Sequence, residues 1–201
     1  MIAVLDYGMG NLRSVEKALE HVGAEVAVTN DHDRIRAADG LVLPGVGAFP
    51  KAMASIRELG LDALVRERVD RGVPTLGICL GLQLLFGHST ELGGADGLGL
   101  VDGHVDKLST GGLKLPQIGW NEVRWRRPSA LLDGLPDRCA MYHVHTYAVR
   151  TDDALGTATY GEEFVSAVER DGVYGVQFHP EKSSGSGLRL LANFARICRA
   201  A

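Results

Sequence analysis

The first half of the chain alternates short apolar runs with segments whose apolar residues recur at helical spacing. The runs have the length of buried strands, and the segments between them place an apolar residue every three or four positions. The predicted strands cover residues 2–5, 25–29, 41–43 and 75–78, and the predicted helices cover 12–22, 50–71 with a possible break at Gly60, and a segment from Leu82. Strands that alternate with helices predict a parallel sheet covered on both faces.

The second half has a different pattern, rich in valine, aromatic residues and strand-like alternation. The segments 101–108, 114–125 and 139–149 are predicted strands, and Phe164–Glu169 and Val173–Phe178 flank an Asp-Gly pair typical of a hairpin. A last helix is predicted over 186–199. Without repeats or linkers, the pattern predicts one α/β domain over residues 1–201, with a mixed sheet and a β-rich C-terminal half.

Composition narrows the possible functions. The net charge is −4 and no run of like charges occurs, which argues against a nucleic-acid or membrane partner. No apolar run is long enough to span a bilayer, and no signal peptide is recognisable. The three cysteines are widely spaced and odd in number, which argues against a disulfide framework and against a zinc site. We therefore expect a reduced, cytoplasmic protein with no metal and no cofactor.

One cysteine lies between two glycines, in Gly77-Ile78-Cys79-Leu80-Gly81, where a predicted strand meets a predicted helix. This pattern is typical of a nucleophile elbow, a strained turn that exposes the nucleophile at the carboxyl end of a strand. The helix N-terminus that follows favours the thiolate form of the sulfur. A small buried structural cysteine is the alternative, and we expect that role for Cys139 and Cys198.

A thiolate that attacks an amide needs an acid for the leaving nitrogen, usually a histidine held by a carboxylate. His179-Pro180-Glu181 follows a predicted strand, and Pro180 disfavours the helical conformation at His179. We expect both side chains on the same side of an extended segment, with the carboxylate on one ring nitrogen. The other histidines considered, which lack such a setting, are expected at the surface: His21, His32, His88 and His104.

An oxyanion hole is the third requirement. The backbone N–H of Leu80 is one natural donor, and Pro44-Gly45-Val46-Gly47 at the end of a neighbouring strand offers a second, from Val46 or Gly47. The alternative for this stretch is a plain strand-to-helix turn.

At these residues the chain resembles the class I (triad) glutamine amidotransferases. The motifs are GICLG at 77–81, GLQLL at 81–85, PGVG at 44–47 and FHPE at 178–181. The resemblance implies a three-layer fold and a Cys79–His179–Glu181 triad that hydrolyses glutamine through a glutamyl thioester and releases ammonia. It also implies a set of residues that bind glutamine: Gly45, Gln83, Glu91, His145, Thr146 and Tyr147.

Longer motifs resemble one family within that class, the glutaminase subunits of imidazole glycerol phosphate synthase in histidine biosynthesis. They are DYGMGNLRSV at 6–15, LPGVGAF at 43–49, GWNEV at 119–123, YHVHTY at 142–147 and HPEKSS at 179–184. The resemblance implies a heterodimer with a cyclase (β/α)₈-barrel subunit. That subunit uses the ammonia to make imidazole glycerol phosphate and an aminoimidazole carboxamide ribonucleotide. Asn11, Trp120, Tyr142 and Lys182 are the candidates for the interface, although core packing is an alternative for Trp120.

Three other functions remain open from the residues. The first is the glutaminase of another synthase, such as pyridoxal phosphate synthase. The second is a non-catalytic relative, and the third is a cysteine peptidase or esterase on a related scaffold. Because a PGVG segment can hold its N–H turned away from the site, we also expect the chain alone to be a poor glutaminase until its partner docks.

Overall fold

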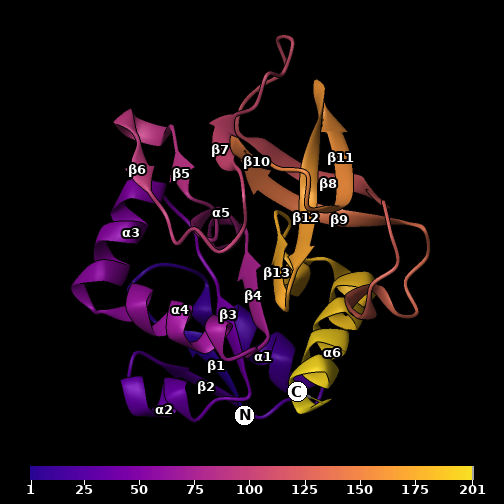
Figure 1. Cartoon of the computed structure of the whole chain (residues 1–201). Coiled ribbons are helices and arrows are strands. Elements are labelled where there is room, and N and C mark those ends of the chain that lie inside the picture. The colour runs from indigo at the N-terminus through magenta and orange to yellow at the C-terminus, as the bar shows by residue number, and fades with distance from the viewer. Residues whose placement is uncertain (201) are drawn as a thin grey trace.

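The computed structural model describes residues 1–200, and a single mixed sheet runs through the molecule (Figure 1). Its central strands are β1 (Ile2–Leu5), β2 (Val26–Thr29), β3 (Gly40–Leu43), β4 (Thr75–Ile78) and β13 (Val173–Val176). They lie in the order β2-β1-β3-β4-β13, and every pair of neighbours is parallel. This confirms the predicted parallel sheet, with β13 added from the far end of the sequence.

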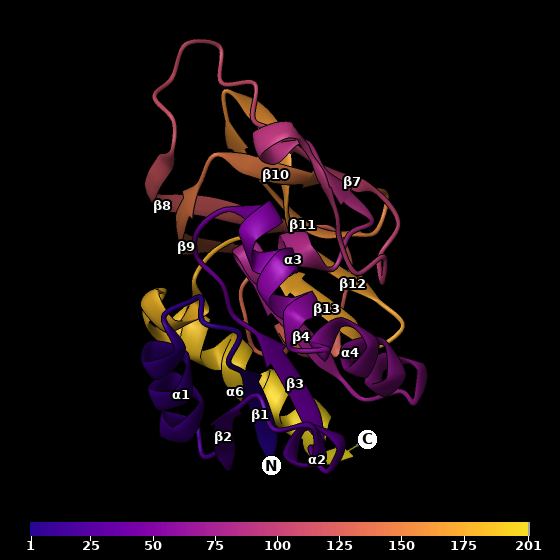
Figure 2. The ribbon, with the colours of Figure 1, turned by 90° about the vertical axis from the view of Figure 1, so that its left-hand side faces the viewer.

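Helices cover both faces of these strands and form a three-layer arrangement (Figure 2). One face carries α1 (Leu12–His21) and α6 (Ser184–Ala200), and the other carries α2 (His32–Arg36), α3 (Phe49–Glu58), α4 (Leu61–Asp70) and the short α5 (Leu80–Leu84). Because successive side chains of a strand point to opposite faces, Val4 packs in the core below α1 and α6. Leu5, the next residue, packs in the core below α3 and α4.

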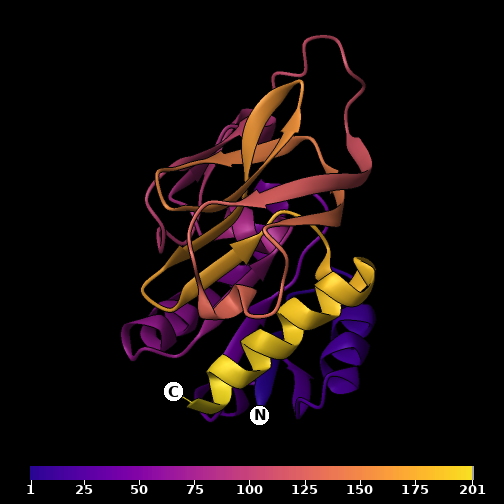
Figure 3. The ribbon, with the colours of Figure 1, turned by 90° about the vertical axis from the view of Figure 1, so that its right-hand side faces the viewer.

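The remaining strands form the predicted β-rich half, which lies beyond the carboxyl end of β13 (Figure 3). Its strands are β5 (His88–Ser89), β6 (Ala95–Asp96), β7 (His104–Lys107), β8 (Gln117–Trp125), β9 (Arg138–His145), β10 (Tyr147–Arg150), β11 (Ala154–Tyr160) and β12 (Glu162–Arg170). Short 3₁₀ helices occur at Glu91–Gly93, Ala130–Leu132 and Pro180–Lys182. Among helices in residues 1–200, none has both the length and the apolar character to cross a bilayer.

The turn between β12 and β13 confirms the predicted hairpin. Arg170 pairs with Val173, so Asp171 and Gly172 form a two-residue loop. Their φ angles are 48° and 81°. The type I′ two-residue hairpin loop, which matches the right-handed twist of the strands, needs positive φ at both positions, so these angles fit. This hairpin places β13 beside β4 and carries the chain to His179.

Some boundaries differ from the predictions. The predicted strand 139–149 divides at Thr146, because β9 pairs with β8 whereas β10 pairs with β7 and β12. Strand β11 was not predicted, since small residues weaken its pattern. Gly156 is one of them, and a Cβ there would lie 2.6 Å from the Trp125 ring. The predicted break of helix 50–71 is confirmed at Gly60, whose φ is 65°.

The two glycines around Cys79 allow close backbone packing. A Cβ at Gly77 would lie 2.6 Å from the backbone carbonyl of Gly81, and a Cβ at Gly81 would overlap the carbonyl oxygen of Leu43. The glycines therefore let α5 pack directly against β3 and β4. The sequence predicts these glycines as part of a strained elbow, and the structure shows which backbone atoms come close to them.

We expect Gly81→Ala to lower the free energy of unfolding by at least about 3 kcal/mol, because the Leu43 carbonyl cannot move without displacing β3. Urea unfolding followed by circular dichroism would measure the change. Gly185→Ala is the matched control, because Gly185 lies on α6 and a Cβ there would have no atom within 4 Å. Equal stability of Gly81→Ala and the parent would contradict the packing argument.

Candidate active site

Three loops meet at the carboxyl edge of the parallel strands because of the strand register. Leu43 of β3 pairs with Gly77 of β4, and Val176 of β13 pairs with Ile78. The residues that follow these strands therefore emerge side by side. They are the PGVG segment at 44–47, Cys79, and the stretch from 177 to His179.

Cys79 occupies a strained turn, as the elbow pattern predicts. Its φ and ψ are 56° and −108°, a region that residues with a side chain rarely adopt. Its backbone N–H donates to the carbonyl oxygen of Val176 at 2.7 Å, which ties the turn to β13. The expected exposure of the side chain was wrong: Cys79 is only 7% exposed, because the β-rich half covers the strand ends.

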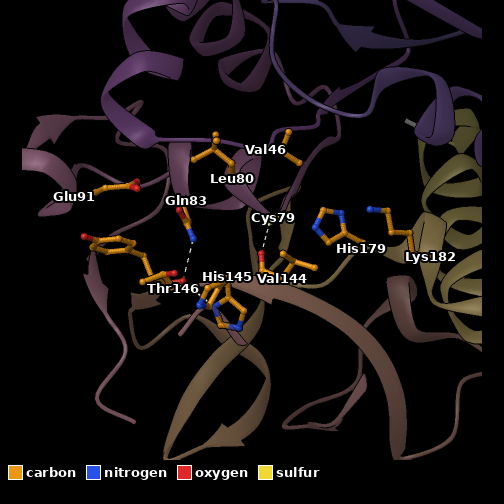
Figure 4. Close-up of a pocket in the computed structure, with 13 residues that line it drawn as sticks. Val46, Cys79, Leu80, Gln83, Glu91, Val144, His145, Thr146, His179 and Lys182 are labelled. Carbon is orange, nitrogen blue, oxygen red and sulfur yellow. Dashed lines mark hydrogen bonds between the residues drawn. The ribbon is translucent and has the colours of Figure 1, made fainter. Parts of the chain in front are cut away.

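The sulfur faces a cavity of about 240 Å³ (Figure 4). The cavity is bounded by residues from both halves of the molecule: Val46, Gly47, Cys79, Leu80, Gln83, Glu91, Pro116, Val144, His145, Thr146, Tyr147, His179 and Lys182. Most residues named from the sequence are thus brought together in one place. Its volume suits a small polar metabolite, and its lining mixes apolar and hydrogen-bonding side chains.

His179 and Glu181 form the expected buried pair. The distance between His179 Nδ1 and Glu181 Oε1 is 2.9 Å, and the two side chains are 4% and 1% exposed. The expectation of one extended segment was wrong, since Glu181 lies in the 3₁₀ helix Pro180–Lys182, which Pro180 begins. The His179 N–H donates to the carbonyl oxygen of Tyr142 at 2.8 Å, so β9 holds the histidine backbone.

The His179 side chain is favoured in its charged form. Burial lowers its pKa, but hydrogen bonds to Cys79 and Glu181, with the attraction of their negative charges, outweigh burial and raise the pKa to about 9. With Glu181 on Nδ1, Nε2 is the ring nitrogen left for the sulfur. This is the arrangement of a nucleophile, an acid–base group and an orienting carboxylate.

The PGVG segment follows β3 and lies against α5. A Cβ at Gly45 would lie 2.5 Å from the Tyr7 hydroxyl and 2.9 Å from Leu80 Cβ, so only glycine fits there. Gly45 therefore lies behind the cavity lining, whereas Val46, Gly47 and Leu80 reach the lining. Gly47 has a φ of 112°.

Tyr7 was not singled out by sequence reasoning, although it anchors this segment. Its buried hydroxyl donates to the carbonyl oxygen of Pro44. Burial, with a smaller effect from Cys79, raises the pKa of Tyr7 far above its usual range, so the hydroxyl keeps its proton and remains a donor. Tyr7 lies in the DYGMGN motif at 6–11, but its hydrogen bond joins it to Pro44, 37 residues away, and no local pattern predicts that contact.

The residues expected to bind glutamine divide into cavity-facing and supporting groups. Gln83, Glu91, Thr146 and Tyr147 line the cavity with accessible atoms. His145 also borders it, but both its ring nitrogens are within hydrogen-bonding distance of protein groups, the Tyr147 carbonyl at 2.8 Å and the Gln117 amide at 3.0 Å. Burial lowers the pKa of His145 to about 4, so it is a neutral support.

Glu91 connects the cavity to α3. Its Oε2 accepts a hydrogen bond from the backbone N–H of Phe49 at 2.9 Å, at the N-terminus of α3. A carboxylate at this position satisfies an otherwise unpaired N–H and interacts favourably with the helix dipole. Glu91 thus fixes the chain two residues after Gly47 while its carboxylate borders the cavity.

Two contacts to the sulfur were also missed from the sequence. The Cys79 thiol donates to the Val144 carbonyl oxygen at 3.6 Å, and the Gln177 side-chain amide donates to Cys79 Sγ at 3.7 Å. Val144 comes from β9, which is distant in sequence. Only the position of Gln177 two residues before His179 could have indicated its role.

The four candidate interface residues are all at least partly exposed. Asn11 and Lys182 are exposed, and Lys182 borders the cavity. Trp120 is 54% exposed, which argues against core packing, and its ring contacts the edge of the half-buried Tyr142 at a centroid distance of 6.0 Å. Cys139 and Cys198 are buried, as expected. His21, His88 and His104 are exposed, whereas His32 is half-buried.

Comparison with known proteins identifies the class to which this site belongs. The profile of the class-I glutamine amidotransferase family matches residues 3–198, and the chain belongs to that family. The imidazole glycerol phosphate synthase subunit HisH of Moorella thermoacetica is 52% identical over 201 residues, covering 98% of this chain and 95% of that protein. The HisH subunit of Aquifex aeolicus is 52% identical over 197 residues, covering 96% and 95%. Within the class, the chain is a member of this HisH family.

Solved structures share the fold at much lower identity. A crystal structure of a glutamine amidotransferase aligns with a TM-score of 0.76 at 21% identity, covering 97% of this chain and 98% of that one. The structure of PurLQS from Thermotoga maritima aligns with a TM-score of 0.77 at 18% identity, covering 98% and 97%. These likenesses confirm the predicted α/β architecture.

The histidine titrations are a direct test of the site electrostatics. We expect NMR of the isolated chain to give a pKa of about 9 for His179, against about 4 for His145 and about 3 for His143. Since the folded-state pKa of His179 exceeds its ordinary 6.5, its contribution to stability is present below pH 6.5 and is lost as the pH rises towards 9. Glu181→Gln should lower the pKa of His179 and weaken this loss. A His179 midpoint at 6.5 in the parent would contradict the assignment.

Proposed function

We propose that the chain is the glutaminase subunit of an imidazole glycerol phosphate synthase, and that Cys79, His179 and Glu181 are its catalytic residues. The observation that carries the proposal is their convergence. A cysteine in a strained elbow and a buried His–Glu pair meet at a small cavity lined by both polar and apolar side chains, in a chain about half identical to HisH subunits. The family match over residues 3–198 and the continuous sheet support one domain over residues 1–201.

The geometry supports a two-step hydrolysis. In the proposed reaction His179 Nε2 already holds the proton of the Cys79 thiol, since His179 is favoured in its charged form, and Cys79 Sγ attacks the side-chain amide carbon of glutamine. His179 then protonates the leaving nitrogen, the C–N bond breaks, and ammonia and a glutamyl thioester are formed. Water, deprotonated by His179, attacks the thioester and releases glutamate. Glu181 holds the ring through Nδ1 and stabilises its positive charge in each step.

The oxyanion of each tetrahedral intermediate needs donors near the sulfur. The N–H of Leu80 at the start of α5 is one, and an N–H of Val46 or Gly47 is the second. Glycine at 47 leaves that peptide free to change orientation, which fits a hole that is completed only in the assembled enzyme.

The cavity offers matching groups for the amino-acid end of glutamine. Both N–H groups of the Gln83 amide are taken, one by the backbone carbonyl oxygen of Tyr147 and one by the side-chain Oε1 of Gln177, each at 3.1 Å. Gln83 Oε1 is therefore the atom left to accept from the substrate's α-amino group. Thr146, Tyr147 and Glu91 also line the cavity, and Glu91 adds a negative charge.

Exposed side chains on β8 and on the PGVG segment suit a protein partner, which we propose is the cyclase barrel subunit. Ile118 and Trp120 lie on one face of β8 and are 64% and 54% exposed. Val46, on the PGVG segment, is 44% exposed. Exposed apolar and aromatic side chains with polar residues such as Asn11 and Lys182 nearby are typical of an interface. The unpaired cysteines of residues 1–200 fit a cytoplasmic location.

Glutamate release from glutamine tests the function. We expect little release by the chain alone and a rise of at least about tenfold with a cyclase barrel subunit and its ribonucleotide ligand, abolished by Cys79→Ala. Strong release that the barrel does not change would keep the glutaminase and refute this partner. No release under either condition would contradict the proposed function itself.

The interface has its own test. Trp120→Ala should raise the dissociation constant for the barrel subunit by at least about thirtyfold, because a half-exposed tryptophan packed on Tyr142 has the features of an interface anchor. Leu59→Ala is the control, since Leu59 is also exposed, at 37%, but lies at the far end of α3. Isothermal titration calorimetry would compare them, and equal dissociation constants would refute this placement of the interface.

A further inference from the structure

A buried glutamine lies beside the sulfur and has no part in the triad. Gln177 is the first residue after β13 and is 0% exposed. Its backbone N–H donates to the carbonyl oxygen of Ser166 at 2.8 Å, which fixes where its side chain begins. Its side-chain Nε2 lies 3.7 Å from Cys79 Sγ. Buried polar side chains need hydrogen-bond partners, and for the Gln177 N–H₂ group the nearby partner is the Cys79 sulfur.

The orientation of this amide is determined by a chain of hydrogen bonds. The backbone carbonyl of Tyr147 can only accept, so the Gln83 side chain must direct its Nε2 towards it. The second N–H of the same nitrogen then needs an acceptor, which is Gln177 Oε1 at 3.1 Å. Gln177 is therefore left with its N–H₂ group towards the sulfur. A backbone carbonyl thus sets the direction of two amides in series.

The sulfur has a second neighbour, which is a hydrogen-bond acceptor and not a donor. The Val144 carbonyl oxygen, 3.6 Å away, accepts from the thiol when the thiol is protonated. Once the proton has left, that oxygen and the anionic sulfur repel each other. The Gln177 N–H₂ group then donates to a negatively charged acceptor, which strengthens its hydrogen bond. The Gln177 contact therefore favours the reactive form of Cys79, whereas the Val144 contact favours the protonated one.

We infer that Gln177 is a positioning residue for the nucleophile: its amide, held by Gln83, donates to the anionic sulfur and offsets the repulsion from the Val144 carbonyl. The inference rests on the proposed function of Cys79 as the nucleophile. It also connects two parts of the site, because Gln83 borders the cavity where the substrate's amino-acid end is placed. A change in the hydrogen bonding of Gln83 is transmitted to the sulfur through one side chain.

The test uses the pH dependence of Cys79 alkylation by iodoacetamide in the isolated full-length chain, followed by mass spectrometry of the Cys79 peptide. It needs neither glutamine turnover nor the partner, so its failure is distinguishable from failure of the proposed function. The buried Cys139 and Cys198 peptides report unfolding in the same samples. Variants are Gln177→Met, which keeps the length of the side chain without its donor, and Gln83→Met, which removes the group that orients Gln177.

We expect Gln177→Met to move the midpoint of the alkylation profile to higher pH and to slow alkylation at neutral pH by about threefold to tenfold. The rate at high pH should stay close to that of the parent, which a merely structural disturbance would not preserve. Gln83→Met should shift the midpoint in the same direction by less, because the Gln177 amide can then turn. Asn193→Leu, which removes an equally buried amide on α6, should leave the profile unchanged.

Superimposable profiles for Gln177→Met and the parent would overturn the inference. If Gln177→Met exposes Cys139 and Cys198 and so fails to fold, Gln83→Met decides, and a profile equal to that of the parent overturns the inference in that case. A shift as large in Asn193→Leu as in Gln177→Met would also overturn it, since the effect would then come from general destabilisation.

Discussion

The register of three parallel strands is the constraint on which the rest of the structure depends. β4 lies between β3 and β13, and Gly77 is paired with Leu43 on one side and with Gly175 on the other. A slip of one residue in either ladder would turn every side chain of that strand to the opposite face. It would also move the PGVG segment or His179 away from Cys79. The glycines at 77 and 81 keep α5 packed on this register, because any Cβ there would meet backbone.

The electrostatics of the site follow from what each histidine contacts. His143 and His179 are both buried and have opposite charge preferences. His143 Nδ1 bonds the Met141 carbonyl, and its Nε2 is hydrogen-bonded to the Ser166 hydroxyl, so burial dominates and lowers its pKa to about 3. His179 has a carboxylate on one side and the Cys79 sulfur on the other, and its pKa rises to about 9. Because His143 and His145 are neutral, no other buried imidazolium repels the charged imidazole of His179.

Local patterns in the sequence predicted those parts of the site that short segments determine. The elbow around Cys79 and the His179–Glu181 spacing each lie within a few residues, so glycine and proline positions were enough to find them. Tyr7, Val144 and Gln177 act through partners 37, 65 and 98 residues away, and no local pattern encodes those distances. The same limit explains the fold. The regular βα half was predicted, whereas the short strands β5 and β6 and the small-residue strand β11 depend on pairing partners.

The PGVG segment is held at both ends and left open in the middle. The Tyr7 hydroxyl donates to the carbonyl oxygen of Pro44, the first residue of the segment, and the Glu91 carboxylate accepts from the N–H of Phe49, two residues after its last. Between these anchors, Val46 borders the cavity and is 44% exposed. Gly47 has a φ of 112°, a conformation that glycine adopts readily and other residues rarely do. In the proposed complex, a partner that contacts Val46 would reorient the peptide at 46–47 without loosening either end. Glu91 also borders the cavity, so the PGVG segment is adjacent both to the proposed partner surface and to the proposed glutamine site. The proposed activation of glutamine hydrolysis by partner and substrate together requires such a shared segment.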